Sequence, residues 1–194
     1  LLKLNQATLN YKWFEIAVSL TNTVIDLYWD DKTGYMYESS KDAKDLFVRP
    51  KSLYDNPYTS SFSKMTEILY ILGSFLNNKY YIDIVQIIIN KMIPYIDKIP
   101  LHTLSWVQTL DKINYDQKNH LFIIHEDKNI DCLSNKLKIN NIPNLIYFGK
   151  SNTIDSSYQV FKDKRSIDGT PTFYLCKSYS CDLPTNSFDD IKSQ

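Results

Sequence analysis

The chain has 194 residues, enough to bury one full hydrophobic core, or one core and a small additional unit. Hydrophobic residues make up 43% of it, as in globular proteins, and the longest apolar run, "YYIDIVQIII", is too short and too polar to span a bilayer. Its 22 basic and 22 acidic residues are well mixed and leave no net field for nucleic acid or an anionic membrane, so neither is expected as a partner.

Amphipathic helices are predicted for most of the first 115 residues. In segment 10–27 the apolar side chains recur at helical spacing and form one stripe, made of Trp13, Ala17, Leu20, Val24 and Leu27. Segment 78–95 repeats this pattern, with Tyr81 in the place of Trp13. The same spacing predicts helices over 62–75 and over 101–113. A repeat that is helical on both sides of a turn containing Asn predicts stacked helical hairpins.

A short β-hairpin is predicted between the two copies of the repeat, in "WDDKTGYMYESS" (29–40). Gly34 supplies the positive φ that a tight turn requires. Because side chains alternate along a strand, Tyr35 and Tyr37 are expected on one face of the hairpin.

The pattern changes after about residue 114, where short apolar runs predict buried strands. These runs are "HLFIIHE" (120–126), "NLIYFGK" (144–150) and "TFYLC" (172–176), with a helix over 129–138 and another in the final "SFDDIKSQ". The prediction is a mainly α chain, with a helical-hairpin portion over residues 1–115 and a small α/β unit over residues 116–194.

The cysteines leave three interpretations open. Cys176 and Cys181 are separated by four residues, more than in the C-x-x-C redox motif, so they are structural thiols, a reversible redox disulfide or half of a metal site. Cys132 and the three histidines show no ligand spacing, and four glycines leave hardly enough for a phosphate loop. We therefore predict no metal and no cofactor. An odd cysteine count does not make a secreted disulfide framework, so a cytoplasmic location is expected.

Three motifs carry a resemblance to a known family. They are "DLYWDDKTGYMYES" (26–39), "RPKSLYD" (49–55) and "DGTPTFYLCKSYSCDLP" (168–184). In these motifs the chain resembles the bacterial thioredoxin-domain proteins related to the spermatogenesis-associated thioredoxin-like protein of animals. The resemblance extends over nearly the whole chain.

The resemblance implies an architecture in which a thioredoxin-like domain precedes an α/α toroid of the six-hairpin glycosidase type and a small α/β region. The present chain would be the C-terminal part, with a partial toroid of helical hairpins followed by the α/β unit. Its expected partners are the upstream thioredoxin-like domain and the remaining hairpins of the same chain.

A toroid of this kind implies a cleft surrounded by the loops at one end of the hairpins, and a carbohydrate as the possible ligand. Glycoside hydrolysis requires two carboxyl groups about 5–5.5 Å apart for retention, or about 6.5–9.5 Å apart for inversion. The candidate catalytic acids are Asp30, Glu38 and Asp55. The candidate binding residues are Tyr35, Tyr37 and Arg49, since aromatic rings can stack on a sugar face. The structural alternative makes Asp30 a turn residue and pairs Asp55 with Arg49 to hold the loop.

Two functions follow from these observations, and the residues do not form a complete catalytic constellation that would decide between them. In the first, the chain belongs to a carbohydrate-related protein whose reaction stays open. In the second, it is a non-catalytic scaffold or interaction region that serves the thioredoxin domain. Segment 56–64, "NPYTSSFSK", has lost the Pro, Gly and Asn of the family's loop, which favours the scaffold.

Overall fold

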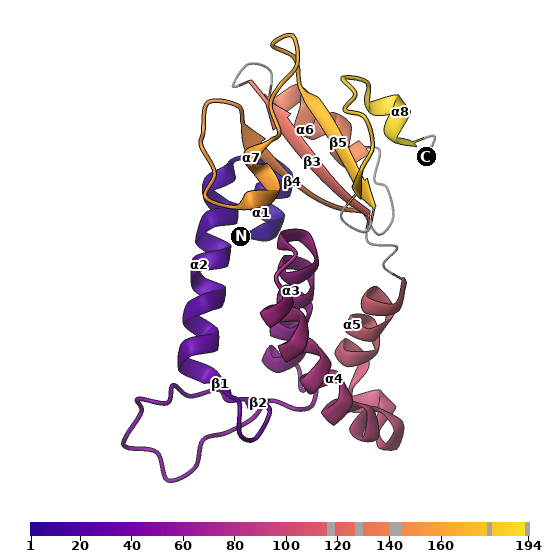
Figure 1. The fold of residues 1–194 in the computed structure, drawn as a ribbon. Helices are drawn as coiled ribbons and strands as arrows, with labels where there is room; N and C mark the ends of the chain where they lie inside the picture. The colour runs from indigo at the N-terminus through magenta and orange to yellow at the C-terminus, as the bar shows by residue number, and fades with distance from the viewer. Residues whose placement is uncertain (116–118, 127–129, 140–144, 178–179, 193–194) are drawn as a thin grey trace. The chain divides into compact units, whose positions relative to one another are not determined.

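The computed structural model describes residues 1–115, 119–126, 130–139, 145–177 and 180–192 (Figure 1). The chain divides into two compact units. The first, called the sheet unit, comprises Leu1–Val18, Phe75–Asn77 and the described residues after position 118. The second, called the helical unit, comprises Ser19–Ser74 and Asn78–Tyr115. The chain is mainly helical with a small mixed sheet, which confirms the coarse class predicted from the sequence.

The five α-helices described in the first 115 residues are α1 (Leu2–Thr8), α2 (Tyr11–Tyr28), α3 (Ser61–Leu76), α4 (Lys79–Lys98) and α5 (Leu104–Tyr115). Four of them, α2 to α5, lie where the apolar spacing predicts them, and α1 precedes them. A single 3₁₀ turn, η1 (Pro100–His102), occupies the first residues of the predicted fourth helix. Pro94 lies inside α4, and the helix continues beyond it to Lys98.

Equivalent turns join the helices in the two copies of the repeat. Leu9 ends α1 in the left-handed region with φ of 54°, and Asn77 follows α3 with φ of 53°. The next residue is Asn in both copies, and its side-chain oxygen accepts from a backbone N–H of the following helix. In the second copy this makes Asn78 the N-cap of α4, a position that Asn favours. The internal repeat is therefore a repeat of backbone conformation.

The predicted hairpin is present between α2 and α3. Strands β1 (Trp29–Asp30) and β2 (Tyr35–Met36) pair antiparallel, with Asp30 opposite Tyr35. Gly34 has φ of 65°, as the turn requires.

The second sheet has the strand order β4-β3-β5-β6. Its strands are β3 (Asn119–His125), β4 (Ile146–Ser151), β5 (Thr172–Lys177) and β6 (Ser180–Cys181), with β3 parallel to β4 and antiparallel to β5. Three helices accompany it: α6 (Ile130–Ile139), α7 (Gln159–Lys162) and α8 (Phe188–Lys192). The first residues predicted for the helix over 129–138 and for the strand over 144–150 lie outside the described residues, as does the predicted unit boundary at 116.

Both faces of this sheet are buried. Leu121 and Ile123 of β3 join an apolar cluster on one face with Leu9, Leu137, Phe173, Leu175, Phe188 and Ile191. Phe122 points to the opposite face, where its ring lies 4.4 Å from that of Phe75 and 5.2 Å from that of Phe161. Burial on both faces explains why β3 reads as a continuous apolar run.

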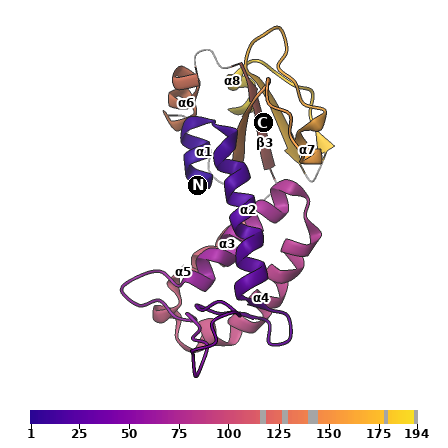
Figure 2. The same ribbon diagram turned by 90° about the vertical axis from the view of Figure 1, so that its left-hand side faces the viewer.

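The N-terminal helix belongs to the sheet unit. Helix α1 packs against α6 and β4, and Figure 2 shows it beside α6. The Asn5 side chain accepts from the Gly149 N–H at 2.9 Å and donates to the Gly149 carbonyl at 3.1 Å, which satisfies the outer edge of β4. The compact sheet unit thus includes Leu1–Val18, which the sequence analysis placed with the helical portion.

Candidate functional site

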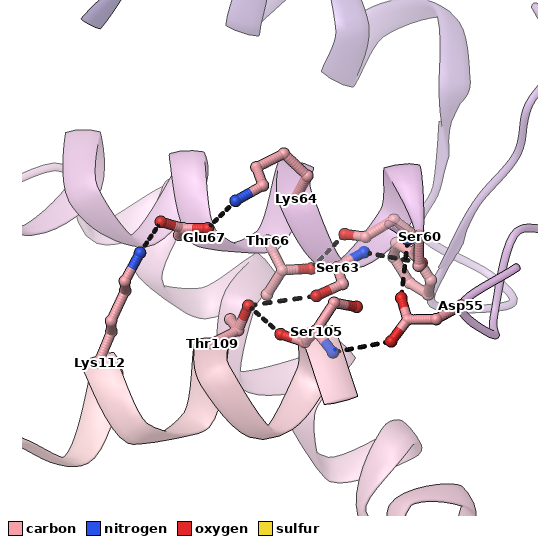
Figure 3. Close-up of polar contacts among 10 residues, drawn as sticks. Asp55, Ser60, Ser63, Lys64, Thr66, Glu67, Ser105, Thr109 and Lys112 are labelled. Carbon is pink, nitrogen blue, oxygen red and sulfur yellow. Dashed lines mark hydrogen bonds and ion pairs between the residues drawn. The ribbon is translucent and has the colours of Figure 1, made fainter. Parts of the chain in front are cut away.

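Asp55 lies between the N-termini of two helices of the helical unit (Figure 3). One carboxylate oxygen accepts from the backbone N–H of Ser60, just before α3, at 2.9 Å. The other accepts from the backbone N–H of Ser105, in the first turn of α5, at 2.7 Å. A carboxylate at a helix N-terminus satisfies an unpaired N–H and meets the positive end of the helix dipole. Asp55 therefore joins the starts of α3 and α5.

A line of buried hydroxyl groups continues from Asp55 between these two helices (Figure 3). The Ser60 hydroxyl accepts from the Ser63 N–H at 3.1 Å and donates to a loop carbonyl, that of Ser52. The Ser63 and Thr109 hydroxyls lie 3.2 Å apart, and Thr109 donates to the Ser105 carbonyl at 3.0 Å. These small side chains pair with each other and with the backbone, so the seam is a structural contact.

The pKa of Asp55 argues against a role as general acid. Burial raises this pKa, but the hydrogen bonds from Ser105 and Ser60 outweigh burial, and the net shift is downward. A general acid at neutral pH needs the opposite shift. The structural alternative also needs correction, because Asp55 holds the loop through Ser60 and Ser105, while the Arg49 guanidinium donates to the Ser39 carbonyl at 2.7 Å.

Asp30 is a turn residue. One of its carboxylate oxygens accepts from the Lys32 N–H at 3.0 Å, the other from the Thr33 hydroxyl at 2.8 Å, and its carbonyl accepts from the Gly34 N–H at 2.8 Å. The hydrogen bond from Thr33 is the main cause that lowers the pKa of Asp30, with smaller effects from Lys32 and the charge of Arg49. Asp30 is thus held ionised by its own turn.

Aromatic and basic side chains gather beside this turn, all within the helical unit. We call this set the tyrosine–cation cluster; it consists of Tyr35, Tyr37, Tyr54, Tyr95, Arg49, Lys51 and Lys91. The Arg49 guanidinium lies 4.2 Å from the centre of the Tyr37 ring. The Lys51 Nζ lies 4.0 Å from the centre of the Tyr35 ring, and the Lys91 Nζ lies 4.9 Å from it.

Packing with other rings completes the cluster. The ring centres of Tyr54 and Tyr95 lie 6.1 Å apart, and Tyr35 packs against Phe62 at 6.2 Å. Burial raises the pKa of Tyr35, and the neighbouring Tyr95 hydroxyl adds to the rise. Tyr35 therefore stays a neutral phenol at physiological pH.

The structure brings together the three predicted binding residues, Tyr35, Tyr37 and Arg49. Each of the three predicted acids lies in a different environment. Asp30 is fixed in its turn, and Asp55 follows Tyr54 but directs its carboxylate to two helix N-termini. Glu38 is exposed just after β2, where its backbone N–H donates to the Pro50 carbonyl.

Four members of the cluster were missed by the sequence analysis. Lys51 and Tyr54 lie inside the quoted motif "RPKSLYD" and carried a signal that was not used. Lys91 and Tyr95 lie on α4, far from the hairpin in sequence, and their pattern reads only as one face of a helix. Ser105, whose backbone N–H donates to Asp55, is also far from its partner in sequence and therefore gave no signal.

Cys176 and Cys181 form a disulfide. They are direct partners across β5 and β6; Cys176 is buried and Cys181 is exposed. Because the two sulfur atoms are bonded to each other, neither is a thiolate that binds a metal. Reversible redox chemistry at this pair stays a prediction. Cys132 is free and exposed.

A cavity of about 790 Å³ lies in the sheet unit, and its described lining includes none of the site residues predicted from the sequence. His125 lines it, with Cys132 and Asp131 of α6. One ring nitrogen of His125 lies 3.0 Å from the Leu9 carbonyl and the other 3.2 Å from the Glu126 carbonyl. Both ring nitrogens face backbone carbonyl oxygens, and a neutral imidazole can donate to one of the two.

Among the residues that the structure describes, no group of three or more His, Cys, Asp or Glu side chains is placed to hold a metal ion. No helix in the described part of the chain is long and apolar enough to cross a membrane. A scan against models of known protein families finds no match, and a search of curated proteins finds no significantly similar sequence.

Proposed function

We propose that this chain is the C-terminal part of a thioredoxin-domain protein with a glycosidase-like α/α toroid, and that its tyrosine–cation cluster binds carbohydrate. The observation that carries the proposal is the convergence of Tyr35, Tyr37 and Arg49, chosen from the sequence alone, into one surface cluster. Sugar-binding sites combine aromatic rings with a few polar groups that fix orientation.

Two further features support the proposal. The matching turns at Leu9 and Asn77 agree with successive helical hairpins, the unit from which a toroid is built. Tyr54 extends the cluster outward and is 37% exposed, so that its ring has surface left for a sugar. The ring faces of Tyr35 and Tyr37 carry ammonium or guanidinium groups, so Tyr54 is the better stacking residue.

A hydrolytic reaction at this cluster would depend on the carboxylates of the predicted acids. Asp30 and Asp55 are held ionised by hydrogen bonds that position the backbone, so neither suits the acid of an acid–base pair. Glu38, which is exposed beside the cluster in sequence, is the remaining acid to test.

The test is a binding survey with soluble oligosaccharides, followed by isothermal titration of those that bind. Tyr54→Ala should weaken binding of a positive ligand at least several-fold, because stacking on an aromatic ring is lost. Tyr58→Ala is the matched control, since Tyr58 is 86% exposed and lies outside the cluster. The proposal is abandoned when no oligosaccharide binds, or when both variants bind like the unmodified protein.

The second candidate function is a scaffold for an upstream thioredoxin-like domain. It is favoured by the structural use of Asp30 and Asp55, which leaves no complete acid–base pair among the predicted residues. It predicts that Glu38→Gln leaves the function of the whole protein unchanged, whereas deletion of the thioredoxin-like domain abolishes it. Loss of function in Glu38→Gln, with unchanged folding, contradicts the scaffold.

A further inference from the structure

The tyrosine–cation cluster gathers three cations that form no ion pair in the described part of the chain. Three cations, Arg49, Lys51 and Lys91, lie within about 5 Å of the rings of Tyr35 or Tyr37. In the described part of the chain, ion pairs form at Lys64, Lys79 and Lys112, and none of the three clustered cations has one. The chain as a whole is neutral, so this concentration is local.

Ring contacts stabilise these cations only modestly. A cation over an aromatic face at an exposed site gains about 0.5–1 kcal/mol, and its charge stays in place. Asp30, which its turn holds ionised, interacts electrostatically with Arg49 and offsets part of the charge of that residue. Lys51 and Lys91 are therefore the two cations of the cluster for which the described residues provide no ion-pair partner.

Two of the three cations have donors to spare. The Arg49 guanidinium donates to the Ser39 and Leu27 carbonyls, so its hydrogen bonds are largely used. Among the hydrogen bonds of the described residues, none involves the Nζ of Lys51 or of Lys91. Lys51 is exposed and Lys91 is half-buried, so both ammonium groups can turn toward a ligand.

Gly34 provides the space in which one of these lysines approaches. A Cβ added at Gly34 would collide with the aliphatic stem of Lys91 and lie 3.0 Å from Ile87. Lys91 thus lies across the turn because position 34 has no side chain. The hairpin turn and α4 together place this cation over Tyr35.

We propose that the tyrosine–cation cluster selects acidic saccharides, in which a sugar carboxylate lies between the ammonium groups of Lys51 and Lys91. This inference rests on the proposed carbohydrate function and narrows it to a substrate class. The carboxylate supplies the ion-pair partner that Lys51 and Lys91 do not find among the described residues, and Tyr54 offers the ring for the adjoining sugar. Charge-assisted hydrogen bonds to a carboxylate are stronger than those to a neutral hydroxyl group.

The experiment compares oligosaccharides of galacturonate, glucuronate and mannuronate with their carboxyl-reduced, neutral counterparts by isothermal titration at low salt. At least one acidic member should bind, and more tightly than its neutral counterpart. In the variant Lys51→Met with Lys91→Met, that binding should weaken roughly three- to thirty-fold, because two exposed charge interactions are lost. The difference should shrink at 0.5 M salt, since exposed charges are screened.

The control is Lys98→Met, which removes an exposed charge at the end of the same helix, α4, and should leave binding unchanged. Equal binding of acidic and neutral forms overturns this inference and leaves the proposed function standing. Absence of any binding overturns both. Competition by inorganic phosphate at the affinity of the best acidic ligand also overturns it, because the cluster would then bind anions without regard to sugar.

Discussion

Replacing Asp55 by Asn tests whether this residue is an architectural anchor. The carboxylate accepts two backbone hydrogen bonds, from Ser60 before α3 and from Ser105 in the first turn of α5. The Asn amide keeps one acceptor oxygen and presents an NH₂ group to the other N–H. The substitution therefore removes one cap and one negative charge while changing the side-chain volume very little.

The magnitude follows from these two losses. A lost cap costs about 1 kcal/mol, and a lost charge at a helix N-terminus costs about 0.3–1 kcal/mol for each of the two helices. Asp55 is partly exposed, which favours the lower part of this range, so the free energy of unfolding of the helical unit should fall by about 2 kcal/mol. With the urea dependence of a small domain, the unfolding midpoint should fall by about 1 M.

Urea unfolding followed by tryptophan fluorescence measures this effect, because Trp106 is fully buried in the helical unit and donates to the Leu53 carbonyl at 2.8 Å. The control is Asp97→Asn, an exposed position on α4. Equal midpoints for the Asp55 and Asp97 variants at pH 7 refute the reasoning.

The pH dependence gives a second check on Asp55. Its pKa is lower in the folded state, so its contribution is fully present above the unfolded-state pKa of about 3.9 and is lost as pH falls through the folded-state pKa. The stability difference between the unmodified protein and Asp55→Asn should therefore shrink below about pH 4. A difference that stays constant down to pH 2.5 contradicts the assignment.

Three further substitutions or treatments test other parts of the structure. Gly149→Ala places a Cβ 2.7 Å from the Cβ of the buried Leu9. It should lower the free energy of unfolding by about 1–3 kcal/mol, seen as a lower thermal midpoint. An unchanged midpoint contradicts the close packing. Reduction of the Cys176–Cys181 disulfide opens a short loop and should cost about 2 kcal/mol, seen in urea unfolding with and without reductant; alkylation of both thiols in unreduced protein contradicts the bond. Gly34→Ala forces a side chain into a residue with φ of 65° and should cost about 1 kcal/mol by chemical denaturation, and no cost would mean that the turn relaxes freely.

The long helices and the three longer strands could be predicted from the sequence, because the side chains that they bury determine the spacing of their apolar residues. The run in β3 reads as a buried strand since both faces of the sheet are covered. Helix α7 and strand β6 escaped prediction because they have four and two residues, about one period of the helical and the strand pattern, which is too short for a pattern to recur. Short elements of this kind are fixed by their neighbours, as β6 is by its pairing with β5.

The candidate site was predicted only in part because sequence spacing reports local proximity. Tyr35, Tyr37 and Arg49 lie close in the chain, and their meeting was foreseeable from a hairpin. Lys91 reaches the same rings from α4 and could not be placed without tertiary packing. The partner of Asp55 was predicted wrongly for a similar reason. Its negative charge suggested Arg49, whereas its carboxylate oxygens accept from backbone N–H groups at two helix N-termini.

The two turns of the repeat show how the same backbone takes different residues. Asn77 is exposed, and Asn tolerates the left-handed region at little cost. Leu9 adopts the same conformation at a cost of about 1 kcal/mol, but its fully buried side chain fills the space that Gly149 leaves and joins the apolar cluster of the sheet unit. Burial of a leucine side chain gains about 1.5–3 kcal/mol, which exceeds the backbone cost. The second turn also belongs to the sheet unit, where Phe75 packs on Phe122, but its Asn77 is exposed. The choice of Leu or Asn at this turn therefore follows the burial of the turn residue itself.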